Sequence, residues 1–365
     1  METIQSYIKK YGHLNFQELE FNDVDNVILA VISYLDFDGI IDVFKKVTIS
    51  SAANSFFNKY SMKEIHRNII SVKNAAKVLE LIKDTNRYSN LVLYNYIYKC
   101  NYEKQFSAMF IDIDENLTYI SFEGTDDKVS GWLEDGALSY QFPVPAQRDA
   151  IKYINHNISI FSPRKYILGG HSKGGNLALV AGMYANPLVR RKIIKIISND
   201  GPGLRLKELE SRKYQKIEKI YDLIVPEYSV VGLLLHHKEP MHIISAGKKG
   251  LMAHDAGCWG VSGTNLQSAT LSNFSKKVDK LIKRWLENYN DEDRKNFMMN
   301  IASILESAGI TSLLDIKASM ISSLIKIVKE SSKLDKKSKD IIIDFGNILM
   351  TSLKEDVASS IKAKF

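Results

Sequence analysis

The pattern of apolar positions changes near residue 106 of the chain. Within the first hundred residues they recur at helical spacing, over residues 24–35 and 65–82, which predicts helices and shows no chemistry. From residue 106 onward, short runs rich in β-branched and aromatic residues appear instead. Residues 107–114 and 117–122 therefore predict two adjacent strands joined by a turn.

Predicted helices and strands then alternate. The helices are expected at residues 145–157, 176–185 and 206–214, and the strands at residues 165–170, 192–199, 216–225 and 241–246. Strands that alternate with helices form a mostly parallel sheet covered by helices on both faces. The predicted fold class is therefore α/β.

The strand pattern stops near residue 267, and four helix-like stretches follow. The last of them, residues 341–361, places an apolar stripe opposite lysines. We expect the apolar faces to pack on the preceding domain or on each other, because an unpaired stripe of that length would exceed the exposed patches usual in soluble proteins. The lysine faces would then point outward, where they favour peripheral contact with an anionic membrane.

Composition narrows the class of protein. The chain has 365 residues, of which 45% are hydrophobic and 25% charged, as in ordinary globular proteins. No stretch approaches the roughly 18 apolar residues of a membrane span, and the first residues lack the apolar core of a secretory signal. Two cysteines, Cys100 and Cys258, are too few for a disulfide framework. We expect a cytoplasmic protein, peripheral at most to the inner membrane face.

Residues 170–174 read Gly-His-Ser-Lys-Gly, a complete G-x-S-x-G motif around Ser172. In a nucleophile elbow the serine lies on a strained turn from a strand into a helix, and small neighbours are needed because a β-carbon would collide with adjacent elements. Here the motif directly follows a predicted strand and opens a predicted helix. We therefore interpret Ser172 as the nucleophile of an α/β-hydrolase fold, rather than as a helix N-cap after a glycine turn.

A serine nucleophile needs a histidine base and an acid, which follow it in the chain order Ser, acid, His. That order leaves His236, His237, His242 and His254 as candidates. We select His254, because it lies in a loop after the last predicted strand, where the fold presents its base.

Two aspartates are candidates for the acid. Asp200 ends a predicted strand and enters the turn Asn-Asp-Gly-Pro-Gly, whereas Asp222 follows within the next predicted strand. Aspartates at strand ends also serve simply as turn formers. We prefer Asp200, because its glycine and proline neighbours fix the turn, and keep Asp222 as the alternative.

The oxyanion hole of this fold uses the backbone N–H of the residue after the nucleophile and another from a loop after an earlier strand. The first donor is Lys173. The loop at residues 120–126 supplies the second, where Gly124 permits close approach and we select Thr125. The other interpretation of this loop is an ordinary β-turn. Residues 126–142 form either a lid or a surface loop.

Several blocks together resemble the Mbeg-like family of bacterial α/β-hydrolase proteins, long described as a domain of unknown function and similar to the class 3 lipases. The blocks are residues 21–37, 124–135, 145–150, 169–178, 199–203, 225–235 and 254–259. The resemblance spans roughly residues 1–265. It implies Ser172 as nucleophile, His254 as base and Thr125 at the oxyanion loop, and it favours Asp200 as the acid.

These inferences predict an α/β-hydrolase domain over residues 1–265, which includes the N-terminal helical segment 1–100, and a C-terminal helical extension over residues 266–365. The predicted activity is that of a serine hydrolase, and the resemblance implies lipid or acyl esters as substrates without metal or organic cofactor. The alternative is a catalytically silent hydrolase-like protein that binds a partner or a membrane surface through its helical tail. A net charge of +7 with scattered lysines gives no pattern for nucleic acid.

Overall fold

The computed structural model describes residues 1–42, 45–101, 104–125 and 129–307. Its centre is an eight-stranded sheet in the order β2-β3-β4-β5-β6-β7-β8-β9. The pairs from β2 to β5 are antiparallel, and those from β5 to β9 are parallel. The strands are β2 (Val47–Thr48), β3 (Val92–Cys100), β4 (Gln105–Asp112), β5 (Leu117–Phe122), β6 (Lys165–His171), β7 (Ile193–Asn199), β8 (Tyr221–Pro226) and β9 (Met241–Ile244).

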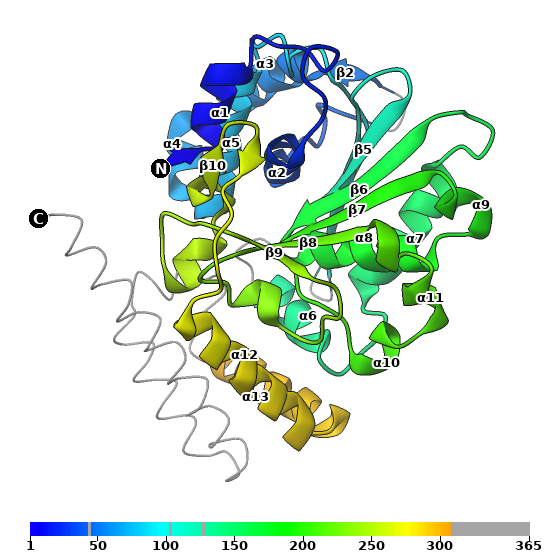
Figure 1. The fold of residues 1–365 in the computed structure, drawn as a ribbon, viewed down its shortest axis with the longest axis vertical. Coiled ribbons are helices and arrows are strands. Elements are labelled where there is room, and N and C mark those ends of the chain that lie inside the picture. Colours follow the sequence, from blue (N-terminus) through cyan, green and yellow to red (C-terminus); the bar gives the residue numbers. More distant parts are fainter. Residues whose placement is uncertain (43–44, 102–103, 126–128, 308–365) are drawn as a thin grey trace, which may run out of the picture.

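Helices cover both faces of this sheet (Figure 1). One face carries the helices of the first hundred residues, and the other carries mainly helices from the middle of the chain. The former are α1 (Ile4–Tyr11), α2 (Asp23–Ile32), α3 (Ile49–Lys59), α4 (Met62–Arg67) and α5 (Ile70–Ile82); the latter include α6 (Val129–Ala137), α7 (Pro145–Asn157), α8 (Lys173–Tyr184), α9 (Pro187–Arg190), α10 (Leu206–Leu209) and α11 (Arg212–Gln215). The predicted α/β fold class is thus confirmed, in the form of an α/β-hydrolase fold.

The sheet has a hydrophobic core on each of its two faces, because side chains alternate between the faces along each strand. On β4, Met109 and Ile111 join the core beneath the N-terminal helices, while Phe106 and Phe110 join the core beneath α7 and α8. Successive side chains of a strand point to opposite faces of its sheet, so a strand buried on both faces is apolar throughout. This explains why the strands of the parallel half read as short continuous apolar runs.

The first hundred residues are not wholly helical, in contrast to the prediction from the sequence pattern. Strand β3 lies there and pairs with β4 in antiparallel fashion. The register of this pair shifts between Tyr94 and Ile97, where Asn95 has a φ of 53°. This bulge interrupts the alternation of apolar and polar positions on which a strand prediction depends.

Two further elements differ from their predictions. The helix expected at residues 206–214 is divided into α10 and α11, because the Ser211 hydroxyl caps a new helix by accepting the Tyr214 N–H at 3.3 Å. The strand expected at residues 216–225 begins as a 3-10 turn, η1 (Glu218–Ile220), and only Tyr221–Pro226 pairs in the sheet.

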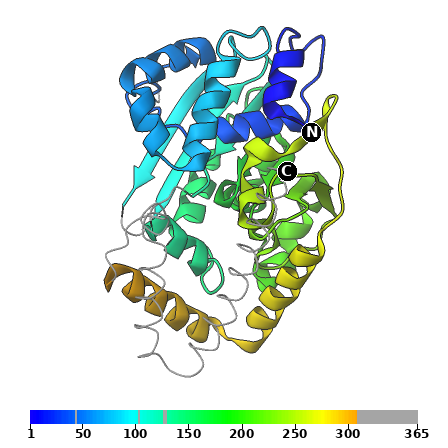
Figure 2. The same ribbon diagram turned by 90° about the vertical axis from the view of Figure 1, so that its left-hand side faces the viewer.

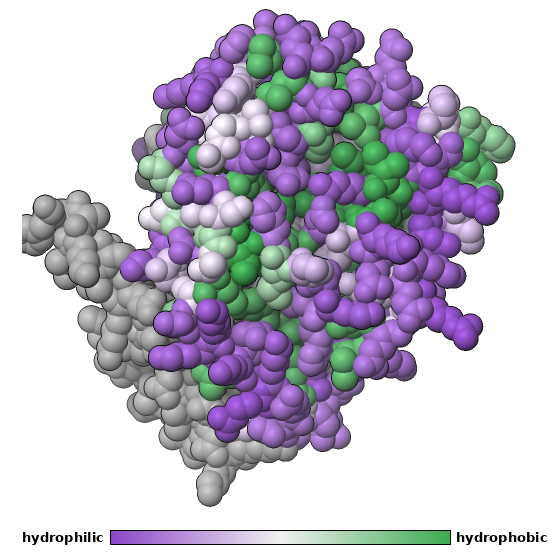
Figure 3. Space-filling view, viewed as in Figure 1, coloured by the Kyte–Doolittle hydropathy of each residue, from purple (hydrophilic) through white to green (hydrophobic). Residues whose placement is uncertain are grey.

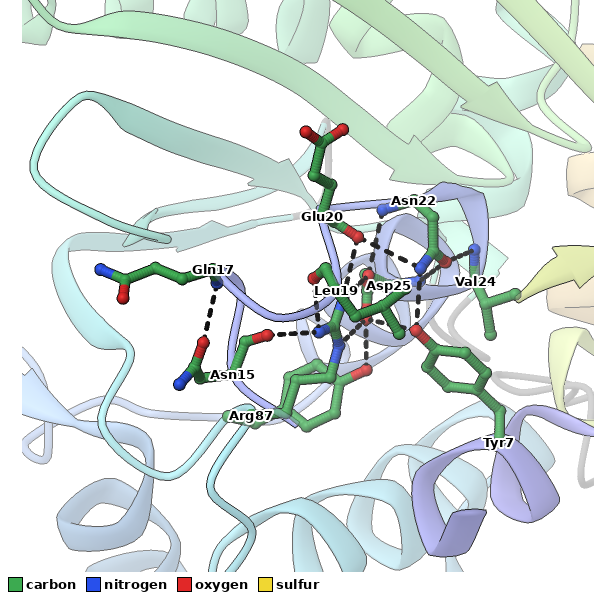
Figure 4. A network of polar contacts seen from close by, with 10 residues as sticks. Tyr7, Asn15, Gln17, Leu19, Glu20, Asn22, Val24, Asp25 and Arg87 are labelled. Carbon is green, nitrogen blue, oxygen red and sulfur yellow. Dashed lines mark hydrogen bonds and ion pairs between the residues drawn. The ribbon is translucent and has the colours of Figure 1, made fainter. Parts of the chain in front are cut away.

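The N-terminal segment is held by a buried ion pair (Figure 4). Arg87 donates to Asp25 through Nε at 2.8 Å and Nη2 at 2.5 Å, and both side chains have no exposed area. Arg87 also donates to the carbonyl oxygens of Leu19 and Glu20, and Tyr88 donates to Asp25. These bonds fix the start of α2 against the segment that precedes β3.

The remaining elements are three short strands, three 3-10 turns and two helices. They are β1 (Glu2–Thr3), β10 (Gly260–Ser262) and β11 (Asn265–Leu266), which form a separate small sheet, then η2 (Val231–Leu233), η3 (Gly250–His254), η4 (Ala256–Cys258), α12 (Asn273–Asn288) and α13 (Asp291–Ser307). Figure 2 places α12 and α13 at the opposite end of the molecule from α1 and α3.

Helix α12 packs on the hydrolase domain, as expected for the start of the tail. Its residues Phe274, Val278 and Ile282 are buried in one cluster with Leu138 and Val144. Lysines on its other side are exposed. The stripe at residues 341–361 lies outside the described residues, so its packing and the membrane contact stay predictions. Among the described residues, no helix combines the length and apolar character needed to cross a bilayer.

Candidate active site

Ser172 lies on the sharp turn between β6 and α8. Its backbone has a φ of 58° and a ψ of −133°, in the left-handed region that residues with a side chain rarely adopt. Strain of this kind concentrates at functional sites. A Cβ at Gly170 would lie 2.4 Å from the Gly174 carbonyl carbon, and one at Gly174 would lie 2.1 Å from the Phe122 oxygen. The packing therefore requires glycine on both sides of the serine, as the motif predicts.

Asp200 occupies the equivalent place on the next strand, directly after β7. Because β6 and β7 are parallel neighbours, their carboxyl ends meet at one edge of the sheet. The side chain of Asp200 is fully buried, and its Oδ2 lies 2.6 Å from Nδ1 of His254. His254 ends the turn η3, which follows β9. The structure thus brings together the histidine and the aspartate that we preferred from the sequence.

Residues after β8 complete the surroundings of Asp200. Its Oδ1 accepts hydrogen bonds from the Ser229 hydroxyl at 2.5 Å and from the Gly232 N–H at 3.0 Å. A Cβ at Gly232 would lie only 2.2 Å from that oxygen. With donors on both carboxylate oxygens, Asp200 is fixed in orientation and its charge is compensated. Sequence reasoning did not single out Ser229 and Gly232, although both lie in one of the family-like blocks.

Asp222 lies elsewhere. It is the second residue of β8, and its carboxylate pairs with Lys195 at 3.0 Å. Its side chain is 53% exposed. The alternative acid therefore has no contact with His254, because position 222 is near the start of its strand and the histidine lies at the other end of the sheet.

The two predicted oxyanion donors, Lys173 and Thr125, belong to the turn around Ser172, named here the nucleophile turn, and to the loop that packs against it. Lys173 is the first residue of α8, so its N–H has no partner within the helix. The loop that follows β5 lies against the turn, since the backbone of Phe122 and Glu123 limits the space at Gly174. Thr125 is the next described residue of this loop after Gly124.

Helix α6 binds the side chains of both residues, Lys173 and Thr125, whose N–H groups are the predicted donors. The buried Lys173 side chain donates to Glu134 at 3.2 Å and to the Gln105 carbonyl at 3.0 Å. The Thr125 hydroxyl donates to Asp135 at 2.6 Å. Residues 129–137 of the segment that we described as a lid or loop thus form a helix tied to the nucleophile turn, while residues 126–128 lie outside the described part.

Asp135 has an unusual environment. Its Oδ1 is buried and accepts no hydrogen bond. Burial raises the pKa of Asp135 from 3.8 to about 6, and the nearby Lys173 ammonium and Thr125 hydroxyl only partly oppose this rise. No sequence signal had marked this residue, because its burial depends on how α6 packs.

The raised pKa of Asp135 predicts a pH dependence of stability. The unfolded chain loses this proton near pH 3.8 and the folded protein near pH 6, so the free energy of unfolding should fall by about 2 kcal/mol as the pH rises from 4 to 7. Asp135→Asn should abolish that contribution. Urea unfolding of both proteins between pH 4 and 7 tests this, with the exposed Asp84→Asn as control. Equal pH dependence of wild type and Asp135→Asn would refute it.

Shallow hollows on the surface lie away from these residues. Two of them, beside α9, are lined by Ile160, Phe161 and Leu188. Figure 3 shows a green, apolar patch at the right-hand edge of the molecule, the side on which Figure 1 places α9. The two hollows lie near the first residues of β6 and β7, whereas Ser172 and Asp200 follow the last ones. Among the described residues, no three His, Cys, Asp or Glu side chains are grouped as metal ligands would be.

A strained serine after one parallel strand, and a buried aspartate after the next that holds a histidine, define an α/β-hydrolase type of protein. The chain belongs to the Mbeg1-like family, whose model matches residues 82–302. No curated protein resembles the chain closely enough to count as a match.

Solved structures similar to this chain include lipases. The M37 lipase is 15% identical, with 57% of this chain and 68% of that one covered and a TM-score of 0.34. The native propeptide complex of Rhizomucor miehei lipase is 14% identical, with 61% and 80% covered and a TM-score of 0.34. A deletion mutant of the same complex is 15% identical, with 63% and 85% covered and a TM-score of 0.35.

Proposed function

We propose that this protein is a serine hydrolase that cleaves carboxylic esters through an acyl-enzyme. The observation that carries the proposal is the contact between His254 and the buried Asp200 beside a serine in left-handed backbone conformation. Acyl esters of lipids are the substrate class that we favour. That choice rests on the resemblance to class 3 lipases, since the same triad also cleaves amides and thioesters.

The geometry supports a specific division of roles. Asp200 accepts the Nδ1 proton of His254, which leaves Nε2 as the atom able to take the hydroxyl proton of Ser172. The serine oxygen then attacks the ester carbonyl, and the N–H groups of Lys173 and Thr125 stabilise the resulting oxyanion. His254 returns the proton to the leaving alcohol, and afterwards activates the water that releases the acid.

Labelling with a fluorophosphonate probe tests this proposal. The wild-type protein should be labelled and should hydrolyse short p-nitrophenyl esters, because the probe reacts with an activated serine. Ser172→Ala should lose both properties. Ser211→Ala, which removes the cap of α11 and a hydrogen bond to the Glu208 carbonyl, should retain both.

The results of this labelling experiment distinguish a serine hydrolase from a catalytically silent binding protein. Labelling that persists in Ser172→Ala would show that the wrong serine has been assigned. A wild-type protein that neither reacts with the probe nor turns over any short ester would favour the catalytically silent alternative.

A further inference from the structure

Tyr34, two residues after the end of α2, brings a hydroxyl group from the N-terminal segment into the candidate active site. It is 5% exposed, and its hydroxyl lies 2.7 Å from Nδ1 of His171. A Cβ at Gly124 would lie 2.0 Å from the same hydroxyl. Tyr34 therefore sits where the nucleophile turn and the oxyanion loop meet, although it precedes the region matched by the family model.

The hydrogen bonds of His171 fix its tautomer. Its Nε2 lies 2.7 Å from the backbone carbonyl oxygen of His254, and a carbonyl can only accept. Nε2 must then carry the proton, Nδ1 must accept, and Tyr34 must donate. Burial lowers the pKa of His171 from 6.5 to about 3, which keeps the ring neutral at ordinary pH.

His171 also constrains the ring of His254. The two rings have centroids 4.5 Å apart at an angle of 33°. Asp200 bonds to Nδ1 at one edge of the His254 ring. His171 packs against the face of that ring and donates to the backbone carbonyl of His254. His254 ends a short 3-10 turn rather than a strand or long helix, so contacts of this kind decide where its ring lies.

We infer that Tyr34 and His171 are positioning residues, which act as a two-bond relay that holds His254 in place for catalysis. The inference rests on the proposed function for its effect on rate, but not for the existence of the relay. It makes the N-terminal segment part of the active site. It also assigns a role to Tyr34 near the end of residues 21–37, the first of the blocks that resemble the family.

Kinetics of matched variants test the effect on rate. Tyr34→Phe and His171→Phe should each lower kcat for a short ester about 10- to 100-fold with KM nearly unchanged, because a small misplacement of a catalytic group slows the chemical step. His171→Gln should keep most of the activity, since its amide can both donate and accept. Tyr153→Phe is the control, because this buried tyrosine also loses a hydrogen bond of its hydroxyl, in its case to the backbone carbonyl of Asn95.

Nitrogen-15 NMR of the histidines tests the relay independently of activity. In the wild type, His171 should stay neutral with its proton on Nε2 from pH 5 to 8, and Tyr34→Phe should change the Nδ1 signal. A His171 that titrates in this range, or a Tyr34→Phe variant as active as Tyr153→Phe, would overturn the inference. If the wild type hydrolyses nothing, the proposed function fails, and the NMR result alone decides whether the relay exists.

Discussion

Asp200→Asn should lower kcat for ester hydrolysis by about 10³- to 10⁴-fold while the fold stays intact. Asparagine keeps the shape of the side chain, but it lacks the charge that holds the Nδ1 proton of His254 and that compensates the imidazolium formed during attack. The residual rate would come from the oxyanion donors and from binding. Initial rates with a p-nitrophenyl ester, measured at saturation, provide the test.

Asp222→Asn is the matched control for this experiment. Asp222 also follows Ser172 in the chain, but its carboxylate pairs with Lys195 and is more than half exposed. We expect its rate to equal that of the wild type. A large loss of kcat in Asp222→Asn, together with a small one in Asp200→Asn, would reverse the assignment of the acid.

Arg87→Met should lower the free energy of unfolding by about 3–5 kcal/mol, because it leaves the Asp25 carboxylate buried without its cation. Arg87 also satisfies carbonyl oxygens of the chain before α2, and these would lose their donor as well. Urea unfolding at neutral pH, followed by circular dichroism, measures the change.

An exposed ion pair supplies the comparison. Lys283 pairs with Asp279 on α12, and the lysine side chain is half exposed, so Lys283→Met should change the free energy of unfolding by no more than about 0.5 kcal/mol. If Arg87→Met has an equally small effect, the buried pair does not hold the N-terminal segment. If the effect is large, activity should fall at temperatures where α2 begins to unfold, since Tyr34 lies two residues after that helix.

The N-terminal segment contacts the candidate active site at two places, through Asn26 and through Tyr34. Asn26 of α2 donates to Asn199 at 2.8 Å, and Asn199 in turn donates to the Gly170 carbonyl and accepts the Ser172 N–H. Helix α2 thus reaches the turn around Ser172 through Asn199, and Tyr34 reaches the same turn through His171. The inclusion of residues 1–100 in one hydrolase domain with residues 101–265 stays a prediction.

The parts of this protein that the sequence determined are local in the chain. The nucleophile turn was predictable because its motif, its glycines and its flanking strand and helix all lie within about twenty residues. Strands β4 to β7 were predictable because burial on one or both faces leaves short apolar runs. Strand β3 was missed because its bulge near Asn95 breaks that pattern.

Only the tertiary structure decided which distant residues meet. Asp200 and Asp222 were both acceptable acids by chain order. The structure separates them because Asp200 follows the carboxyl end of β7 and contacts His254, whereas Asp222 lies near the start of β8. Tyr34 lies 137 residues before its partner His171, and no local pattern encodes such a contact. Side-chain positions of this kind follow from the packing of α2 on the sheet, which all the intervening elements determine together.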